Sequence, residues 1–239
     1  MMSKTPRARS CRIIFVKERN MRIALDGPSG AGKSTVAKAL AKRLGIIYVD
    51  TGALYRTVGL YVRNKGIDKD DNPNIIKCLD EIKLDMQFVD GEQIITLNGD
   101  KIGQEIRTGE IAMYASRVSA IPEVRAFLLE TQRKIAREND VVMDGRDIGT
   151  VIIPDAEVKI FMVASPEARA KRRYLELQAK GESCTLESVL ADIIERDTND
   201  STRKTAPAIP AADAIHLDNS DLDIEQTVEK VIEIIESKK

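Results

Sequence analysis

The stretch DGPSGAGKST (26–35) follows a short apolar run and precedes a segment whose apolar residues recur every three or four positions. It matches the pattern G-x-x-x-x-G-K-[ST], whose glycines let several backbone N–H groups turn toward a phosphate chain. A helix beginning near Lys33 would add the positive end of its dipole. Because a strand is predicted before the loop and a helix after it, we expect this loop to bind a nucleoside triphosphate.

Two side chains of the loop have specific expected tasks. Lys33 is expected to reach the β- and γ-phosphate oxygens, and the Ser34 hydroxyl is suited to Mg²⁺ bound with the nucleotide. The residues predicted to contact ATP are Gly27, Pro28, Ser29, Gly30, Ala31, Gly32, Lys33, Ser34 and Thr35.

Strand-like and helical segments alternate outward from the loop. Short apolar runs predict strands at 21–27, 46–50, 141–145, 158–164 and 214–219. Apolar residues at helical spacing predict helices at 33–45, 52–66, 122–139, 165–181, 185–200 and 224–238. This order is typical of a parallel α/β sheet with right-handed crossovers.

The alternation breaks between residues 84 and 102. Two strand-like runs flank a tight turn at Gly91, which predicts a β-hairpin. An antiparallel hairpin inside an α/β chain indicates a small inserted subdomain, roughly 66–105.

Composition excludes several classes of function. Of 239 residues, 37 are Lys or Arg and 38 are Asp or Glu, so the net charge of −1 does not favour nucleic-acid or membrane binding. Three separated cysteines (Cys11, Cys78 and Cys184) favour a reducing, cytoplasmic compartment over a disulfide or zinc framework. The single histidine, His216, gives little support to histidine-based catalysis.

The first twenty residues differ from the rest. Six basic residues and one acidic residue give them a charge of +5 (6 − 1), and Met21 opens the first strand. We interpret this extension as a disordered tail or an early start codon, with an Arg-rich organelle presequence as the alternative.

A phosphate loop serves switches, ATP-driven machines and small-molecule kinases. A GTPase would need N-K-x-D, but NKGID (64–68) has its Asp one residue late, and we interpret it as a helix end running into a turn. An ATP-driven machine usually needs partner surfaces and a longer chain. The remaining class, a small-molecule kinase, predicts a second binding site rich in arginine.

Candidates for this second site follow predicted strands. Tyr55 and Arg56 come one turn into the helix after strand 46–50, and Arg146 and Asp147 follow strand 141–145. Ligands of open α/β sheets bind beyond the carboxyl ends of the strands, so these residues are expected to face one crevice. Arg125, one turn into another helix, is a weaker candidate.

Further charged residues lie near the C-terminal third. Arg196, Asp200 and Arg203 have i, i+4, i+7 spacing, and on spacing alone we favour an ordinary exposed salt-bridge ladder. The preceding helix carries a basic cluster: Arg169, Lys171, Arg172 and Arg173. A basic helical flap between two core elements is also typical of a lid that closes over phosphates.

Several motifs together resemble those of bacterial cytidylate kinases, from Met21 to the end of the chain. They are GPSGAGKST, VDTGALYR, ASRVSAIPEVR, DGRDIGT, VKIFMVAS, ERDTNDSTR and APAIPAADAIHLDN, in that order. The phosphate loop is shared by many families, whereas DTGALYR, GRDIGT and ERD together are much more specific.

The resemblance implies a P-loop nucleoside monophosphate kinase fold. Its parts would be a core (21–65, 106–170 and 205–239), a nucleoside-monophosphate-binding insert (66–105) and a short helical lid (171–204). The implied CMP-binding residues are Thr51, Tyr55, Arg56, Ser116, Arg125, Arg146, Asp147, Arg196, Asp200 and Arg203. The implied catalytic cations are Lys33, Arg146, Arg196 and Arg203.

Roles within this set are also implied by the resemblance. Ser116, Arg125 and Asp147 would read the cytosine edge, since cytosine offers an amino donor beside N3 and O2 acceptors. Two arginines, Arg56 and Arg146, would hold the CMP phosphate. The resemblance thus moves the Arg196 ladder from the surface to the site, with Arg196 and Asp200 meeting the sugar and Arg203 bridging sugar or phosphate.

Two positions leave the assignment open. The family usually has E-R-D-x-R-D in the lid, but this chain has Asn199 where the second Arg is expected. An arginine there could stabilise the transferring phosphoryl group or only bind. Ser116 matches the family position by its distance to Arg125, and Ser119 is its rival.

The expected reaction is transfer of the γ-phosphoryl group of Mg-ATP to CMP or dCMP by a monomeric enzyme. Acceptors such as UMP, AMP or a non-nucleotide stay open as alternatives, as does a non-catalytic nucleotide-binding protein. The preference between CMP and dCMP and the choice of phosphate donor also stay open.

Overall fold

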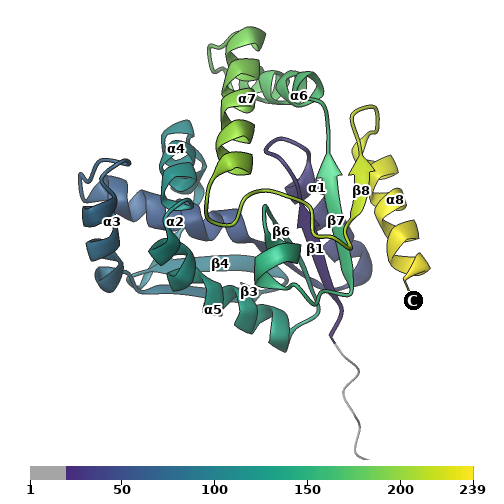
Figure 1. Cartoon of the computed structure of the whole chain (residues 1–239), viewed down its shortest axis with the longest axis horizontal. Coiled ribbons are helices and arrows are strands. Elements are labelled where there is room, and N and C mark those ends of the chain that lie inside the picture. The colour runs from purple at the N-terminus through teal and green to yellow at the C-terminus, as the bar shows by residue number, and fades with distance from the viewer. Residues whose placement is uncertain (1–19, 239) are drawn as a thin grey trace, which may run out of the picture.

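The computed structural model describes residues 20–238. Except for Asn20, the expectations for the basic segment 1–20 therefore lie outside the described residues. Within the described range, no helix is both long and apolar enough to cross a membrane. Figure 1 shows a central sheet flanked by helices, with further helices at the end toward which β7 points.

A parallel five-stranded sheet forms the centre of the fold, as predicted. Its strands are β1 (Arg22–Asp26), β2 (Ile47–Asp50), β6 (Val141–Gly145), β7 (Val158–Val163) and β8 (Ile215–Asp218), in the order β2-β6-β1-β7-β8. All residues of β1 are buried, because this strand is central and covered on both faces. The phosphate loop therefore starts from the middle of the sheet.

Helices cover both faces of this sheet. They are α1 (Lys33–Leu44) and α8 (Ile224–Ser237) on one face, and α2 (Thr51–Asn64), α4 (Gly109–Val118) and α5 (Pro122–Glu138) on the other. Residues of β1 alternate between two hydrophobic clusters: Ile23 and Leu25 pack with α1 and α8, whereas Ala24 belongs to the larger cluster under the other helices. The phosphate loop is thus anchored in both clusters.

Two glycines end the first helices, as predicted. Gly45 caps α1 with φ 68°, and Gly66 follows α2 with φ 70°. Both values are left-handed, which glycine adopts without steric cost. The NKGID segment is therefore a helix end running into a turn, as interpreted from the sequence.

The predicted hairpin belongs to a separate antiparallel sheet. Its strands are β3 (Leu84–Val89), β4 (Glu92–Leu97) and β5 (Asp100–Ile102), in that order. The turn at Gly91 is confirmed, with φ 52° at Asp90 and φ 79° at Gly91. The prediction of two strands was incomplete, because β5 has only three residues and pairs through the tight Asn98–Gly99 turn.

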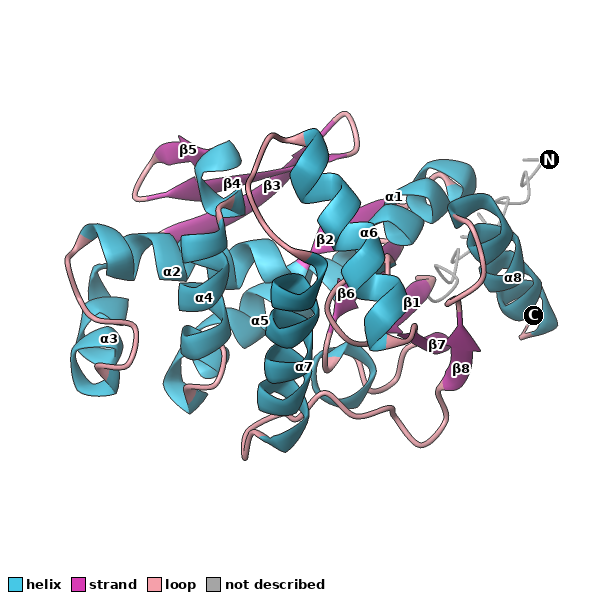
Figure 2. Cartoon of the chain, turned by 90° about the horizontal axis from the view of Figure 1, so that it is seen from above, coloured by secondary structure: helices cyan, strands magenta, loops and turns pink. Residues whose placement is uncertain are grey.

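Two helices had not been predicted, α3 (Asn72–Cys78) and α4. The start of α4 is capped by Thr108, whose hydroxyl accepts from the Ile111 N–H at 3.2 Å. Its buried positions Ile111 and Ala115 are four residues apart, a spacing too short in extent to stand out in the sequence. Figure 2 shows α3 and α8 at opposite ends of the molecule.

Short helical turns complete the chain between these elements. They are η1 (Leu79–Glu81), η2 (Gln104–Arg107) and η3 (Ile148–Ile152), of which η3 is a π-type turn directly after the GRD segment.

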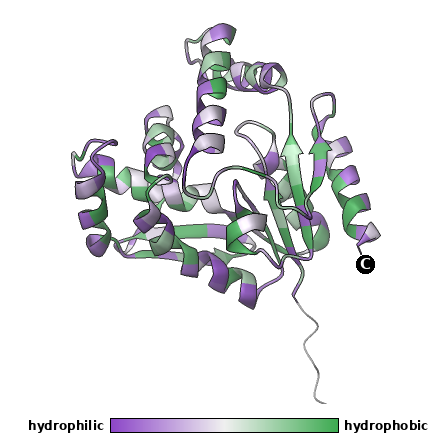
Figure 3. Ribbon diagram, in the orientation of Figure 1, coloured by the Kyte–Doolittle hydropathy of each residue, from purple (hydrophilic) through white to green (hydrophobic). Residues whose placement is uncertain are grey.

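Two helices form the predicted flap, α6 (Pro166–Ala179) and α7 (Leu186–Thr202). The α6 N-terminus is capped as predicted, with the Ser165 hydroxyl accepting from the Ala168 N–H at 3.1 Å. The two helices share only a small buried cluster. Figure 3 shows hydrophilic residues over much of both helices, in contrast to the hydrophobic central strands.

Candidate active site

A pocket of about 1100 Å³ lies at the carboxyl ends of the parallel strands, where ligands of open α/β sheets bind. It reaches from the phosphate loop to α2, α4 and the two flap helices. The predicted residues that line it are Ser29, Gly30, Gly32, Lys33, Ser34, Thr35, Thr51, Tyr55, Arg56, Ser116, Arg125, Arg146, Asp147, Arg196, Asp200 and Arg203. Three residues of the loop, Gly27, Pro28 and Ala31, do not line it.

The shape of the phosphate loop depends on its first glycine. Gly27 has φ 144°, and a Cβ there would lie 2.0 Å from the Met162 carbonyl oxygen. No side chain fits this approach to β7. Gly32 ends the loop as the N-cap of α1, with φ 85°. The loop is therefore fixed by its backbone.

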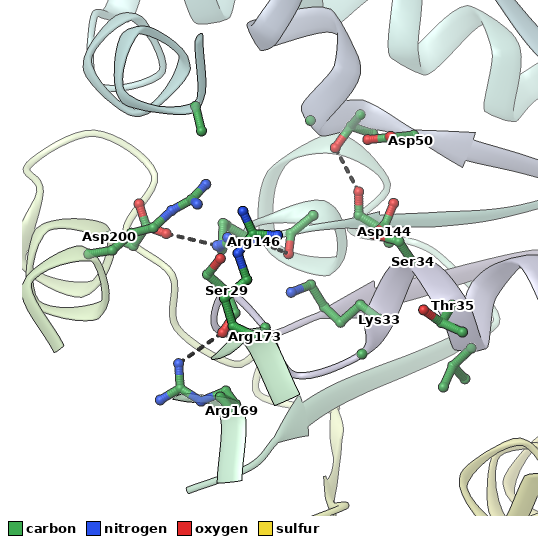
Figure 4. A pocket seen from close by; sticks show the side chains of 18 of the residues that line it. Ser29, Lys33, Ser34, Thr35, Asp50, Asp144, Arg146, Arg169, Arg173 and Asp200 are labelled. Atoms are coloured by element: carbon green, nitrogen blue, oxygen red, sulfur yellow. Dashed lines mark hydrogen bonds and ion pairs between the residues drawn. The ribbon is translucent and has the colours of Figure 1, made fainter. Parts of the chain in front are cut away.

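Lys33 extends into the pocket toward Arg146, as Figure 4 shows. Its Nζ donates to the Pro28 carbonyl oxygen at 2.7 Å. Burial and the nearby charge of Arg146 lower the pKa of Lys33 well below its ordinary value, against the opposing charge of Asp144. A phosphate anion in the pocket would stabilise the ammonium form.

Ser34 contacts a carboxylate that the sequence analysis did not single out. Its Oγ donates to Asp144 Oδ2 at 2.6 Å, while the Tyr48 hydroxyl donates to Asp144 Oδ1 at 3.1 Å. Burial and the charge of Asp50 raise the pKa of Asp144, so a cation beside it would favour the ionised form.

The donor set around Ser34 fits Mg²⁺. Among residues 20–238 no group of three or more His, Cys, Asp or Glu side chains could hold a metal ion. Mg²⁺ does not require such a cage, because it keeps several waters and is usually bound through one or two carboxylates together with substrate phosphates. The Ser34 hydroxyl and the Asp144 carboxylate offer oxygen ligands of this kind.

Asp50, at the end of β2, connects several parts of the pocket wall. Its Oδ1 accepts from the Ala53 N–H and caps α2, while Oδ2 accepts from Arg56 at 2.7 Å and from Arg107 at 3.5 Å. Its backbone pairs with the side-chain amide of Gln93 on β4, at 2.8 and 3.2 Å. This residue therefore ties the antiparallel sheet to two arginines of the pocket.

Arg146, directly after β6, forms the centre of a cationic cluster. Its Nε donates to Asp200 Oδ2 at 2.8 Å, as Figure 4 shows. Burial opposes ionisation of Asp200, but the charge and hydrogen bond of Arg146 outweigh it and lower the pKa of Asp200. Burial and Arg146 lower the pKa of Arg196 to about 10. The Arg196 Nε is buried with no hydrogen-bond partner among the described residues, so the cluster can accept an anion.

A second cluster lies deeper, around the ion pair of Arg125 and Asp147. Both side chains are buried, 8% and 4% exposed. Arg203 approaches Asp147 at 3.9 Å and donates to the Ser119 hydroxyl at 3.3 Å. The Arg125 guanidinium lies 5.5 Å from the centre of the Tyr55 ring. Donors and acceptors thus lie side by side at the end of the pocket.

The two rival serines differ in their partners. Ser119 is buried, and its hydroxyl donates to the Ser116 carbonyl oxygen at 2.9 Å while it accepts from Arg203. Ser116 lies one turn earlier on α4 and is half-buried. Both line the pocket.

The interpretation of residues 196–203 as an exposed ladder was wrong. Asp200 is only 7% exposed, and all three charged residues line the pocket. They do not share one helical face either, because α7 ends at Thr202 and Arg203 is extended, with φ −60° and ψ 141°. The turn after the helix brings Arg203 beside Asp147. Asn199 is exposed and does not line the pocket.

The basic cluster on α6 divides into separate contacts. Arg169 is 2% exposed and donates to the Ser29 carbonyl oxygen at 2.9 Å and to Asp197 of α7, so it ties the flap to the phosphate loop. Arg172 and Arg173 line the pocket, whereas Lys171 does not. The cluster therefore does not act as one exposed basic face.

Four pocket residues were missed from the sequence. Asp50, Asp144 and Asn219 end strands or follow them directly, so a search for polar residues at the carboxyl ends of strands would have found them. Asn219 donates to the Ala31 carbonyl oxygen of the phosphate loop at 2.9 Å. No signal marked Arg107, which lies in the short turn η2.

Comparison with known proteins agrees with this geometry. The family model for cytidylate kinase matches residues 23–237. The chain is 51% identical to a cytidylate kinase of Thermosipho melanesiensis over 217 residues, covering 91% of this chain and 97% of that protein. It is 49% identical to one of Fervidobacterium nodosum, with the same coverage. A solved structure of an uncharacterized Eubacterium ventriosum protein shares the fold, with 16% identity, a TM-score of 0.50 and coverage of 91% of this chain and 99% of that one. The chain belongs to the cytidylate kinase family.

Proposed function

We propose that this protein transfers the γ-phosphoryl group of ATP to CMP or dCMP, giving ADP and CDP or dCDP. One observation carries the proposal: a single pocket joins the phosphate loop to the buried pair of Arg125 and Asp147. Membership of the cytidylate kinase family supports the same acceptor.

Recognition of cytosine follows from the chemistry of the buried pair. The Asp147 carboxylate accepts from the exocyclic amino group, and Arg125 donates toward N3 and O2. Uracil would present a carbonyl to the carboxylate and an N–H to the guanidinium, leaving both buried groups mismatched. Ser116 or Ser119 adds a hydroxyl at the same end of the pocket.

The acceptor phosphate is bound by exchanging carboxylates for substrate oxygens. In the structure Arg56 is paired with Asp50, and Arg146 with Asp200. Arg196 has an unpaired Nε, so this cluster carries more positive charge than its acids neutralise. We assign Thr51 and Tyr55 to the wall beside this phosphate, and Asp200 and Arg203 to the sugar.

Transfer needs positioning and charge neutralisation rather than a general base. The acceptor is already an anion at neutral pH, so Lys33, Arg146, Arg196 and Arg203 act by holding the reacting oxygens in line and stabilising developing charge. Ser34 and Asp144 would hold Mg²⁺, which neutralises phosphate charge when bound.

We further assign residues 66–105 to an acceptor-binding insert and residues 171–204 to a lid. Closure of α6 and α7 over the pocket would exclude water, which would otherwise hydrolyse ATP. We expect the enzyme to act as a monomer in the cytoplasm.

The test measures ADP release from Mg-ATP, coupled to NADH oxidation, with CMP, dCMP, UMP, AMP or no acceptor. Release with CMP and dCMP alone is expected. Preference for UMP or AMP would contradict cytosine recognition. Release without acceptor would indicate an ATPase, and silence in every well with ATP bound would indicate a non-catalytic nucleotide-binding protein.

A further inference from the structure

Asp26, the last residue of β1, joins two segments that are more than 100 residues apart in sequence. Its Oδ1 accepts from the Ile148 N–H at 2.8 Å, and its Oδ2 accepts from the Gly149 N–H at 2.8 Å. The side chain is buried, and the residue is followed directly by Gly27 of the phosphate loop. Asp26 thus lies between the donor side and the acceptor side of the pocket.

The two amides belong to the segment that carries the acceptor-side residues. Ile148 and Gly149 come directly after Arg146 and Asp147 and open the π-type turn η3. Fixing both amides on one carboxylate fixes the direction in which the two preceding side chains leave the backbone.

The contact requires close approach at Gly149. A Cβ on this residue would lie 3.2 Å from the Lys159 Cδ and 3.4 Å from Asp26 Oδ2. These distances are tighter than ordinary packing, so a side chain here would push the amide away from the carboxylate. The absence of a side chain at this position matches the requirement of the hydrogen bond.

Asp26 does not serve stability in the usual way. Burial raises its pKa to about 6 even though both amides favour the ionised form, with Asp147 adding to the rise and Lys33 opposing it. A buried ionised carboxylate is costly, whereas a neutral residue would avoid that cost. The geometry of the turn, rather than the stability of the fold, explains what the carboxylate contributes.

We propose that Asp26 is a positioning residue that holds the acceptor-reading segment 146–149 in register with the phosphate loop. The proposal rests on the function proposed above. An ionised carboxylate has two acceptor oxygens for the two amides, whereas an asparagine would turn an N–H₂ group toward one of them. Substitution should therefore displace Arg146 and Asp147 more than the phosphate loop.

The phosphate loop has anchors that do not involve Asp26. Gly27 packs against the backbone of Met162, Asn219 donates to the Ala31 carbonyl oxygen, and Arg169 donates to the Ser29 carbonyl oxygen. ATP affinity should therefore survive a substitution that disturbs the acceptor side.

The experiment compares Asp26→Asn with wild type in steady-state kinetics, direct ATP binding by calorimetry and thermal unfolding. We expect the KM for CMP to rise and kcat/KM to fall by about 30-fold, on the scale of a 1 Å misplacement of reacting groups. We expect the Kd for ATP to change by less than about threefold, because the loop anchors remain. The melting temperature should be equal or higher.

The matched control is Asp140→Asn. Asp140 also accepts a backbone N–H at one end of β1, from Met21 at 2.6 Å, but it is exposed and outside the pocket. Its kinetics should equal those of wild type. Gly149→Ala disturbs the same contact from the other side without changing charge, and should shift the KM for CMP in the same direction.

The results separate the two proposals. Wild-type turnover with the acceptor panel tests the function, and the same comparison of variants is made with whichever monophosphate is accepted. A KM for the acceptor within threefold of wild type in both variants overturns the positioning role, as does an equal loss of acceptor and ATP affinity. If Asp26→Asn does not fold, the result for Gly149→Ala decides.

Discussion

The phosphate loop comes from one stretch of ten residues, whereas the acceptor wall is gathered from α2, α4, α5, α7 and the turn after β6. The loop is shaped by its backbone: Gly27 fits against β7 because it has no Cβ, and Gly32 caps α1 with a positive φ. The acceptor wall is instead held by side-chain ion pairs.

This difference sets what each region tolerates. A backbone site keeps its shape so long as the glycines remain. In the acceptor wall, Arg56 and Arg146 each rest on a carboxylate that a substrate phosphate can replace. The donor region is therefore preformed, whereas the acceptor region is prepared by exchangeable pairs.

The sharpest test of the donor region is Lys33→Ala. We expect a loss of about 10³-fold or more in kcat, because the ammonium group neutralises charge on the transferring phosphoryl group. The fold should persist, since removing a buried cation leaves no unpaired charge on Pro28, whose carbonyl accepts from Lys33. Turnover is measured by ADP release and folding by circular dichroism.

Lys42→Ala serves as the control, because Lys42 is exposed on the same helix and lies outside the pocket. Near-normal kcat in Lys33→Ala would contradict the assigned role of the phosphate loop.

The matching test of the acceptor region is Asp147→Ala. We expect kcat/KM for CMP to fall by about 100-fold, because a buried donor on the base and on Arg125 both lose their acceptor. ATP affinity should change little, since the loop is fixed independently. Removal of one partner of a buried pair also destabilises the fold by about 3–5 kcal/mol, so unfolding is measured alongside.

The exposed Asp192 on α7 provides the control substitution Asp192→Ala. Equal losses of affinity for CMP and ATP in Asp147→Ala would contradict recognition of the base by this side chain.

How far the sequence predicts each region follows the same division. The phosphate loop, the five parallel strands and the helix stops at Gly45 and Gly66 were predictable, because each depends on a local pattern of glycines or apolar residues. The same holds for Arg146 and Asp147, whose place after a strand already indicates the ligand-binding edge.

The acceptor wall could be predicted only in part. The spacing of Arg196 and Asp200 is equally typical of an exposed helix, and only tertiary packing buries Asp200 against Arg146. Arg107 depends on the path of the antiparallel sheet, which places it beside Asp50. Such contacts arise from chain segments far apart in sequence, so no local pattern announces them.

A smaller effect is expected where the two regions meet, at Asp26. Its pKa is about 6 in the folded protein against 3.8 ordinarily, so the unfolded chain loses its proton first as pH rises. Ionised Asp26 therefore destabilises the fold, increasingly from about pH 4 to 6 and fully above that range. Asp26→Asn removes this pH-dependent penalty.

The free energy of unfolding of Asp26→Asn, relative to wild type, should therefore be more favourable at pH 7.5 than at pH 5, by about 1 kcal/mol. Urea unfolding at the two pH values measures the difference. A pH-independent difference would show that the carboxyl group titrates alike in the folded and unfolded chain.

The smallest effect is expected at Asn199, where relatives usually carry arginine. Asn199 is exposed on α7 and outside the pocket, whereas Arg196 and Asp200 on the same helix line it. The cluster around Arg146 already supplies cations to the acceptor phosphate, so Asn199→Arg should raise kcat by less than about threefold, far below the 10³-fold or more of an arginine finger. Steady-state kinetics with CMP measure it, and Thr198→Arg, one residue earlier and also exposed, is the control for added charge. A rise of 100-fold or more in Asn199→Arg alone would mean that lid closure carries position 199 to the transferring group, and the acceptor region would then depend on motion more than on the pairs that hold it open.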